Sequence, residues 1–227
     1  MQETHDQLKP FFAASPVRSF RKGEIIIFQG EAPRSAYAVK SGTIKAYNLS
    51  VNGDEKPVAF YTAGSVFPIS WAFGQAPSAI YYYEAFSEEV SLYAINREAY
   101  TEYLQTRPKL LYSTLLQMVK EQLGSSMRLN ALQHSRASDK LIYTLHYLAL
   151  SHGRTRGPQE TEITLELTHQ DFANLTGLTR ETAATELNKL KHQGVISYGK
   201  HTPYRLHIGK LNTLLNDQYI ADLKIKL

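Results

Sequence analysis

Cysteine is absent from this chain of 227 residues. Its absence excludes disulfide bonds, a thiolate nucleophile and any zinc or iron–sulfur centre held by cysteine. Histidine is absent from residues 6–133, so the amino-terminal half lacks the histidine cluster that metal-dependent barrel enzymes need. No Ser-His-Asp arrangement, phosphate-cradling glycine loop or pair of catalytic carboxylates stands out. We therefore predict a protein that is not an enzyme, with no catalytic residues, cofactor or metal ion.

Long hydrophobic runs are also lacking. The longest, Leu141–Leu150, has the length of a buried helix and falls well short of a membrane span. The first 16 residues contain no basic start followed by an apolar run, so they do not form a secretory signal. These features predict a cytoplasmic protein with no membrane contact.

Positive charge is distributed unevenly, although the net charge is only +4. Residues 1–107 carry ten basic and eleven acidic side chains, whereas residues 136–210 carry ten basic and seven acidic ones. The chain is long enough for two domains, so the second one holds the basic excess. That excess is consistent with a nucleic-acid partner but is weak evidence alone.

Residues 168–196 have the pattern of two short helices joined by a turn. Thr168 and Asp171 have the spacing of a capping box at the start of the first helix. Gly177 suits the turn because it tolerates positive φ, and Thr179 can cap the second helix. The side of the second helix that we expect to be buried holds Ala183, Leu187 and Leu190. This pattern predicts a DNA-reading helix-turn-helix, with an ordinary helical hairpin as the alternative.

The segment after these helices indicates a β-hairpin. Residues 195–198 and 204–208 contain apolar and β-branched side chains that favour strands. Residues 199–203, between them, contain residues that favour a turn. A helix-turn-helix followed by such a wing forms a winged-helix domain. We expect Lys200 and His201, at the tip of the wing, to lie near DNA phosphates.

The amino-terminal half has a different pattern, with short strands separated by glycine turns between residues 17 and 94. Asn52-Gly53 is a strong hairpin turn within this region. Strands at such spacing predict an antiparallel barrel or roll that can enclose a small ligand.

Residues 107–135 predict one long helix between these two regions. Seven of its residues are spaced alternately four and three positions apart and so form a seam along one side of the helix. They are Leu111, Leu115, Met118, Gln122, Ser125, Leu129 and Leu132. Such a seam favours a partner helix and hence a homodimer. A helix packed on its own roll is the alternative, because Gln122 and Ser125 are polar.

Phe20–Tyr47 closely resembles the start of the β-roll in the Crp/Fnr family of bacterial transcription regulators. Its Gly-Glu, Gln-Gly-Glu and Ser-Gly turns carry the resemblance, together with Thr-Arg-Glu-Thr at residues 179–182. The resemblance implies an α+β protein with an antiparallel, jelly-roll-like β-roll, a dimerisation helix and a winged helix-turn-helix. We expect these parts at residues 14–106, 107–135 and 136–212, followed by a tail at 213–227. The implied partners are double-stranded DNA, a second copy of the chain and RNA polymerase.

The resemblance also implies which residues contact DNA. Arg180, Glu181 and Thr185 take the positions that face the bases, where arginine suits guanine and glutamate suits cytosine. Family members that read common half-sites carry arginine in place of Thr185, so we expect an altered half-site. Further residues are expected to contact DNA, chiefly its backbone. They are Thr168 and Gln170 at the start of the first helix, and Thr179, Thr182, Lys189 and Lys191 on the second.

The residues expected at the effector site differ from those of cyclic-nucleotide-binding members. In cyclic-nucleotide-binding members a Gly-Glu pair and an Arg-Ser pair hold the ligand, but here those positions fall on Pro68-Ile69 and Ala79-Ile80. We therefore expect neither cyclic-AMP binding nor, without cysteine, an iron–sulfur cluster. A pocket for an uncharged or aromatic molecule is one hypothesis, and core packing or a protein without effector are the alternatives. The residues of that hypothetical pocket are Ser125, Ser126, Tyr61, Trp71 and Tyr82.

The sequence as a whole predicts a homodimeric, sequence-specific transcription regulator that binds a palindromic operator. The alternative is a winged-helix scaffold that contacts protein partners and does not read bases.

Overall fold

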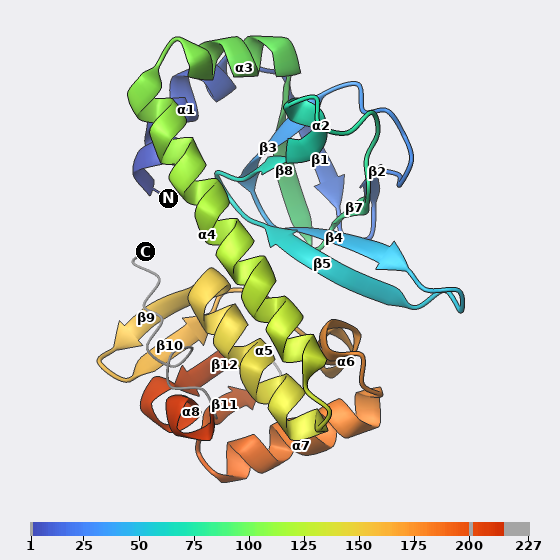
Figure 1. Ribbon diagram of the computed structural model, residues 1–227, viewed down its shortest axis with the longest axis vertical. Helices are drawn as coiled ribbons and strands as arrows, with labels where there is room; N and C mark the ends of the chain where they lie inside the picture. Colours follow the sequence, from blue (N-terminus) through green and yellow to red (C-terminus); the bar gives the residue numbers. More distant parts are fainter. Residues whose placement is uncertain (1, 200–201, 216–227) are drawn as a thin grey trace. The chain divides into compact units, whose positions relative to one another are not determined.

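The computed structural model describes residues 2–199 and 202–215, with side chains from residue 8 onward (Figure 1). The chain divides into two compact units, residues 1–119 and residues 120–227. The boundary between the units falls within the long helix α4 (Pro108–Gln133).

The first unit contains two four-stranded antiparallel sheets, as the strand pattern predicted. One sheet has the order β1-β8-β3-β6 and the other the order β2-β7-β4-β5. The first is built from Val17–Arg21, Glu89–Ile95, Ala36–Ser41 and Val66–Phe67, in that order. The second is built from Ile25–Ile27, Tyr82–Ala85, Ile44–Leu49 and Glu55–Tyr61.

Alternation along the strands separates a core from an outer face. Ile44 and Ala46 of β4 are fully buried in the core of the roll. Aromatic rings occupy much of that core, and the rings of Phe67 and Tyr83 stack with centroids 5.1 Å apart. Since successive side chains of a strand point to opposite faces, Lys45 lies on the other face of the sheet.

Three helices accompany the roll: α1 (Gln2–Ala13), α2 (Ile69–Ala72) and α3 (Arg97–Gln105). They form a second core with β3 and β8, in which Phe12 and Leu104 are almost completely buried. We did not predict α1 or α3 from the sequence.

The helix α4 begins at Pro108, a residue suited to a first helical position, and ends close to the predicted boundary. An unusual number of its large apolar side chains are exposed: Leu111, Tyr112, Leu115, Leu116, Val119, Leu129 and Leu132. Among the described helices, none is long and apolar enough to cross a membrane.

The second unit combines helices with a four-stranded sheet of order β11-β12-β10-β9. After α4 come α5 (Ala137–His152) and a hairpin, β9 (Gly153–Gly157) and β10 (Glu160–Ile163), which the sequence analysis did not predict. The unit continues with α6 (His169–Thr176), α7 (Arg180–His192), β11 (Ile196–Gly199), β12 (Thr202–His207) and α8 (Ile208–Leu214). The last two strands are the predicted wing, and Ile208 begins α8 instead of ending β12.

Candidate nucleic-acid interface

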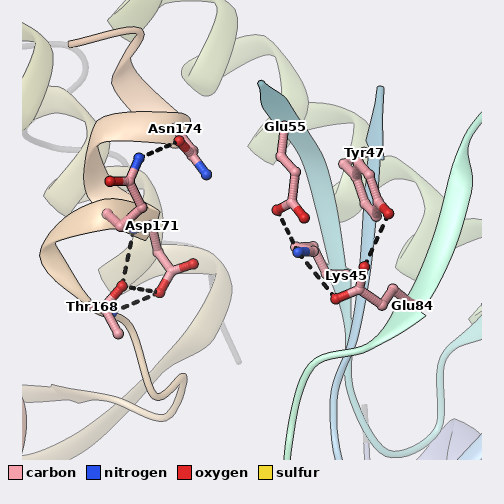
Figure 2. Close-up of polar contacts among 8 residues, drawn as sticks. Lys45, Tyr47, Glu55, Glu84, Thr168, Asp171 and Asn174 are labelled. Carbon is pink, nitrogen blue, oxygen red and sulfur yellow. Dashed lines mark hydrogen bonds and ion pairs between the residues drawn. The ribbon is translucent and has the colours of Figure 1, made fainter. Parts of the chain in front are cut away.

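The start of α6 is fixed by a reciprocal cap. The hydroxyl of Thr168 accepts the backbone N–H of Asp171 at 3.2 Å, and an Asp171 carboxylate oxygen accepts the backbone N–H of Thr168 at 2.7 Å (Figure 2). The arrangement is the predicted capping box. It satisfies two amide groups that have no partner within the helix.

The turn after α6 requires glycine. Gly177 ends the helix with φ of 68°, a conformation that costs a residue with a Cβ more than it costs glycine. The next N–H group, of Leu178, donates to the carbonyl of Ala173 at 3.1 Å. This closure directs the chain into the second helix.

The helix α7 has one buried and one exposed side. Thr179 caps it by accepting the N–H of Thr182 at 3.2 Å, as predicted. Ala183, Leu187 and Leu190 are buried against the rest of the unit. The opposite side begins with Arg180, Glu181 and Thr185, all of which are exposed. A free helix end with these side chains can present hydrogen-bonding groups to base edges.

The residues expected near the DNA backbone differ in exposure and in the partners that their side chains already have. Gln170 is exposed on α6, and its amide donates to Oδ1 of Asn174 at 2.8 Å. Thr182 is only partly exposed because it lies against Thr179. Lys189 forms an ion pair with Glu186 at 2.6 Å, which a phosphate would have to displace.

The wing is anchored to both helices by aromatic residues. Lys200 and His201, the predicted phosphate contacts at its tip, lie outside the described residues. At the base of the wing, Tyr198 stacks on Tyr204 at 4.6 Å between centroids and donates its hydroxyl to Asn188 of α7 at 2.9 Å. This contact between Tyr198 and Asn188 could not be predicted from the sequence, because a tyrosine in a strand gives no sign of its partner.

One further residue belongs to this surface. His169 is the first residue of α6, and its ring packs edge to face against Tyr198 with centroids 5.6 Å apart. Partial burial and the nearby guanidinium of Arg180 lower the pKa of His169. The two helix ends thus combine two basic side chains with the positive ends of two helix dipoles.

The three aromatic residues proposed to line an effector pocket pack in different surroundings. Tyr61 contacts Phe67 and Tyr83 in the core of the roll. Tyr82 stacks on Tyr47. Trp71 packs against Arg97, whose guanidinium carbon lies 4.8 Å from the centroid of the Trp71 ring. The structure does not gather them around one described cavity.

Ser125 and Ser126 are exposed on α4, and both belong to the second unit. Their hydroxyls donate to the carbonyls of Glu121 at 3.0 Å and of Gln122 at 3.1 Å. These bonds follow the usual pattern of serine within a helix, so the structure adds no sign of a ligand here.

A shallow pocket of about 460 Å³ does occur in the first unit, but outside the core of the roll. It lies between α2, α3 and the start of α4, and Phe73, Arg97 and Leu111 are among its lining residues. Within the part of the chain that the structure describes, no group of three or more histidine, aspartate or glutamate residues could hold a metal ion.

Comparison with known proteins assigns both units. Residues 17–107 match the cyclic nucleotide-binding domain, and residues 139–215 match the Crp-like helix-turn-helix domain. The chain belongs to the Crp/Fnr family of transcription regulators. It is therefore a DNA-binding regulator of the Crp/Fnr type and not an enzyme, and its DNA-binding part is the helix-turn-helix built by α6 and α7.

Several family members are similar over most of their length. Electron transport regulator A of Shewanella oneidensis is 28% identical over 208 residues, which cover 90% of this chain and 80% of that protein. The fumarate and nitrate reduction regulatory protein of Vibrio cholerae is also 28% identical, over 91% of this chain and 77% of its own.

Solved structures show the same fold at lower identity. FixK2 from Bradyrhizobium japonicum is 20% identical, with a TM-score of 0.71 over 88% of this chain and 97% of its own. TTHA1359, a CRP/FNR family regulator from Thermus thermophilus, is 21% identical, with a TM-score of 0.63 over 92% of this chain and 99% of its own.

Proposed function

We propose that this regulator binds a palindromic operator as a homodimer and reads each half-site with the amino-terminal end of α7. The observation that carries the proposal is the exposure of Arg180 and Glu181 at a capped helix end whose other side is fully buried. Burial of Ala183 and Leu187 fixes the rotation of α7 about its own axis, so the side chains of Arg180 and Glu181 point away from the domain.

The proposed base contacts follow from side-chain chemistry. Arg180 can donate two hydrogen bonds to guanine, and Glu181 can accept one from the amino group of cytosine. Thr185 adds a short side chain that suits a thymine methyl group or a single hydrogen bond. We assign Thr168, Gln170, Thr179, Thr182, Lys189, Lys200 and His201 to contacts with the DNA backbone, which position the protein.

The exposed face of α4 supports the proposed dimer. Leu115 is 52% exposed and Leu129 is 60% exposed, and both belong to the predicted seam. Tyr112, Leu116 and Val119 are also exposed, which widens the apolar surface beyond the predicted seam. Exposed apolar side chains in this number on one helix favour burial against a second copy. Two-fold symmetry then places two α7 helices one turn of DNA apart.

We further propose that cyclic AMP is not the effector. Ile69 and Ile80 stand where cyclic-nucleotide-binding members carry a glutamate and a serine, and Pro68 and Ala79 complete the changed pairs. The only lysine on β4, Lys45, lies outside the core and pairs with two glutamates. A cyclic phosphate buried in this roll would lack a counter-ion, which is costly.

We assign the roll to residues 14–106, the dimer helix to 107–135 and the winged helix to 136–212, with a tail at 213–227. Control of transcription implies contact with RNA polymerase and a location in the cytoplasm, where the operator is. A small-molecule effector, if one acts, shifts the population of dimers whose α7 helices are correctly spaced.

Selection of bound duplexes from a random-sequence pool tests the proposal. We expect enrichment of a palindrome with two half-sites about one helical turn apart, and a dimer mass in light scattering. Binding to the selected duplex should survive a large excess of unrelated competitor DNA. Equal binding to all duplexes would contradict base reading and favour the scaffold alternative.

A further inference from the structure

His169 is held at the junction of α6, α7 and the wing. Its ring meets the ring of Tyr198 at an interplanar angle of 86°, and the hydroxyl of Tyr198 bonds to Asn188 of α7. The side chain is only partly exposed, at the amino end of α6. The imidazole therefore has a defined place on the surface that faces DNA.

One positive group acts on this imidazole. The guanidinium of Arg180, on α7, lies close enough to lower the pKa of His169, in addition to the effect of partial burial. The nearest aromatic neighbour, Tyr198, also carries the ammonium group of Lys191 over its ring, 4.6 Å from the centroid. The carboxylate of Asp171, on the same helix, is turned back to the N–H and hydroxyl of Thr168. Free amide groups at both helix ends add to the positive potential. In the absence of DNA, partial burial and then the charge of Arg180 favour the neutral ring.

We propose that His169 takes up a proton when α6 and α7 engage the operator, so that its imidazolium faces a backbone phosphate beside Arg180. The proposal rests on the DNA-binding mode proposed above. The proton comes from solvent and stays on the ring, and no covalent bond other than this N–H bond is formed or broken. A phosphate beside His169 favours the protonated ring over the neutral ring, because the imidazolium then gains an anionic partner.

A definite pH dependence follows. The free protein favours the neutral ring of His169 and the complex favours the charged ring. Binding therefore consumes protons at pH values between the pKa of His169 in the free protein and its pKa in the complex. Affinity must then rise as the pH falls through that window. With one such residue per subunit, we expect operator affinity to rise by about 10-fold between about pH 7.5 and about pH 6.

Other histidines provide controls. Burial lowers the pKa of His146 and of His152 to about 4, which is below the window. Nδ1 of His207 accepts the N–H of Lys210 at 3.3 Å as the cap of α8. His192 is the control, because it is an exposed histidine at the last residue of α7, at the opposite end of that helix from Arg180.

The experiment measures the affinity of the full-length protein for its selected operator by fluorescence anisotropy, from about pH 6 to about pH 8.5 at constant ionic strength. His169→Gln removes the charge and keeps a polar side chain, His169→Arg makes the charge permanent, and His192→Gln is the control. Thermal unfolding at each pH verifies that every variant is folded across the range.

We expect His169→Gln to bind like the parent at about pH 8.5 and to lose the rise toward about pH 6. His169→Arg should bind at all pH values at least as tightly as the parent does at the acidic end, and His192→Gln should keep the parent's profile. A parental pH profile in His169→Gln, or equal weakening at every pH, would overturn the proposal. Failure of the parent to prefer the operator at any pH would instead refute the proposed function.

Discussion

The ammonium group of Lys45 lies 3.3 Å from the carboxylate of Glu84, although only 5% of Lys45 is exposed (Figure 2). Glu55 holds the same ammonium group from the neighbouring strand, and Glu84 also accepts the hydroxyl of Tyr47 at 2.9 Å. This network joins β4, β5 and β7 on the side of the sheet away from the core. It adds side-chain contacts to the backbone pairing of β4 with β5 and β7.

Removal of the lysine should destabilise the first unit strongly. Lys45→Met leaves two partly buried carboxylates without their counter-ion, and loss of one partner from a buried ion pair costs about 3–5 kcal/mol. Since Glu55 can reach water, we expect a somewhat smaller decrease of about 2–4 kcal/mol in the free energy of unfolding. Urea denaturation followed by circular dichroism measures it.

A surface ion pair in the same unit provides the control for this substitution. Lys22 pairs with Glu88 at 2.8 Å, with side chains 53% and 77% exposed. Lys22→Met should therefore change the free energy of unfolding by about 1 kcal/mol or less. Equal effects of the two substitutions would show that burial of Lys45 has no energetic consequence.

The exposed face of α4 leads to a prediction about assembly. Leu115→Glu combined with Val119→Glu would place four like charges within a symmetric pair of α4 helices. We expect a monomer in light scattering and a loss of about 100-fold or more in operator affinity, because one α7 helix then binds alone. Val51→Glu, at a fully exposed position of the roll, should leave both unchanged. A dimeric double variant would exclude α4 as the interface.

Arg180 is predicted to determine one base pair of the half-site. Arg180→Ala removes two hydrogen bonds to guanine and should cost about 1–3 kcal/mol of specific binding while relaxing the preference at that position. Affinities for a set of operators with single base changes measure this. If Arg180 contacts only phosphate, the variant will instead bind every duplex more weakly by the same factor.

Buried histidine makes the second unit sensitive to acid. His146 is 3% exposed, burial lowers its pKa to about 4, and its Nδ1 has no hydrogen-bond partner among the described residues. The unfolded chain binds a proton near pH ~6.5, so stability falls as the pH drops from about 6.5 toward 4, by up to about 3 kcal/mol.

Chemical denaturation between about pH 4 and about pH 8 measures this dependence. His146→Leu should remove part of it, and the rest is expected from His152, whose pKa burial also lowers to about 4. His192→Gln, which changes an exposed side chain, should retain the full dependence. An unchanged slope in His146→Leu would mean that the folded protein already accommodates the charged ring.

The sequence by itself determined the features that depend on local spacing. Thr168, Asp171 and Gly177 specify a helix cap and a turn through bonds within a few residues, so their roles were predicted correctly. The strands of the roll and the length of α4 follow from alternation and from the helical repeat in the same way. The match to the family models confirmed the architecture that these patterns predicted.

The tertiary structure decided which distant residues meet. Lys45 and Glu84 are 39 positions apart, and only strand pairing brings their side chains together. The same holds for Tyr198 with His169 and Asn188, which connect the wing to both helices. Local pattern carries no information about such pairs, because burial and charge compensation depend on how the elements pack. For that reason the aromatic residues Tyr61, Trp71 and Tyr82, grouped on sequence alone, lie in separate surroundings.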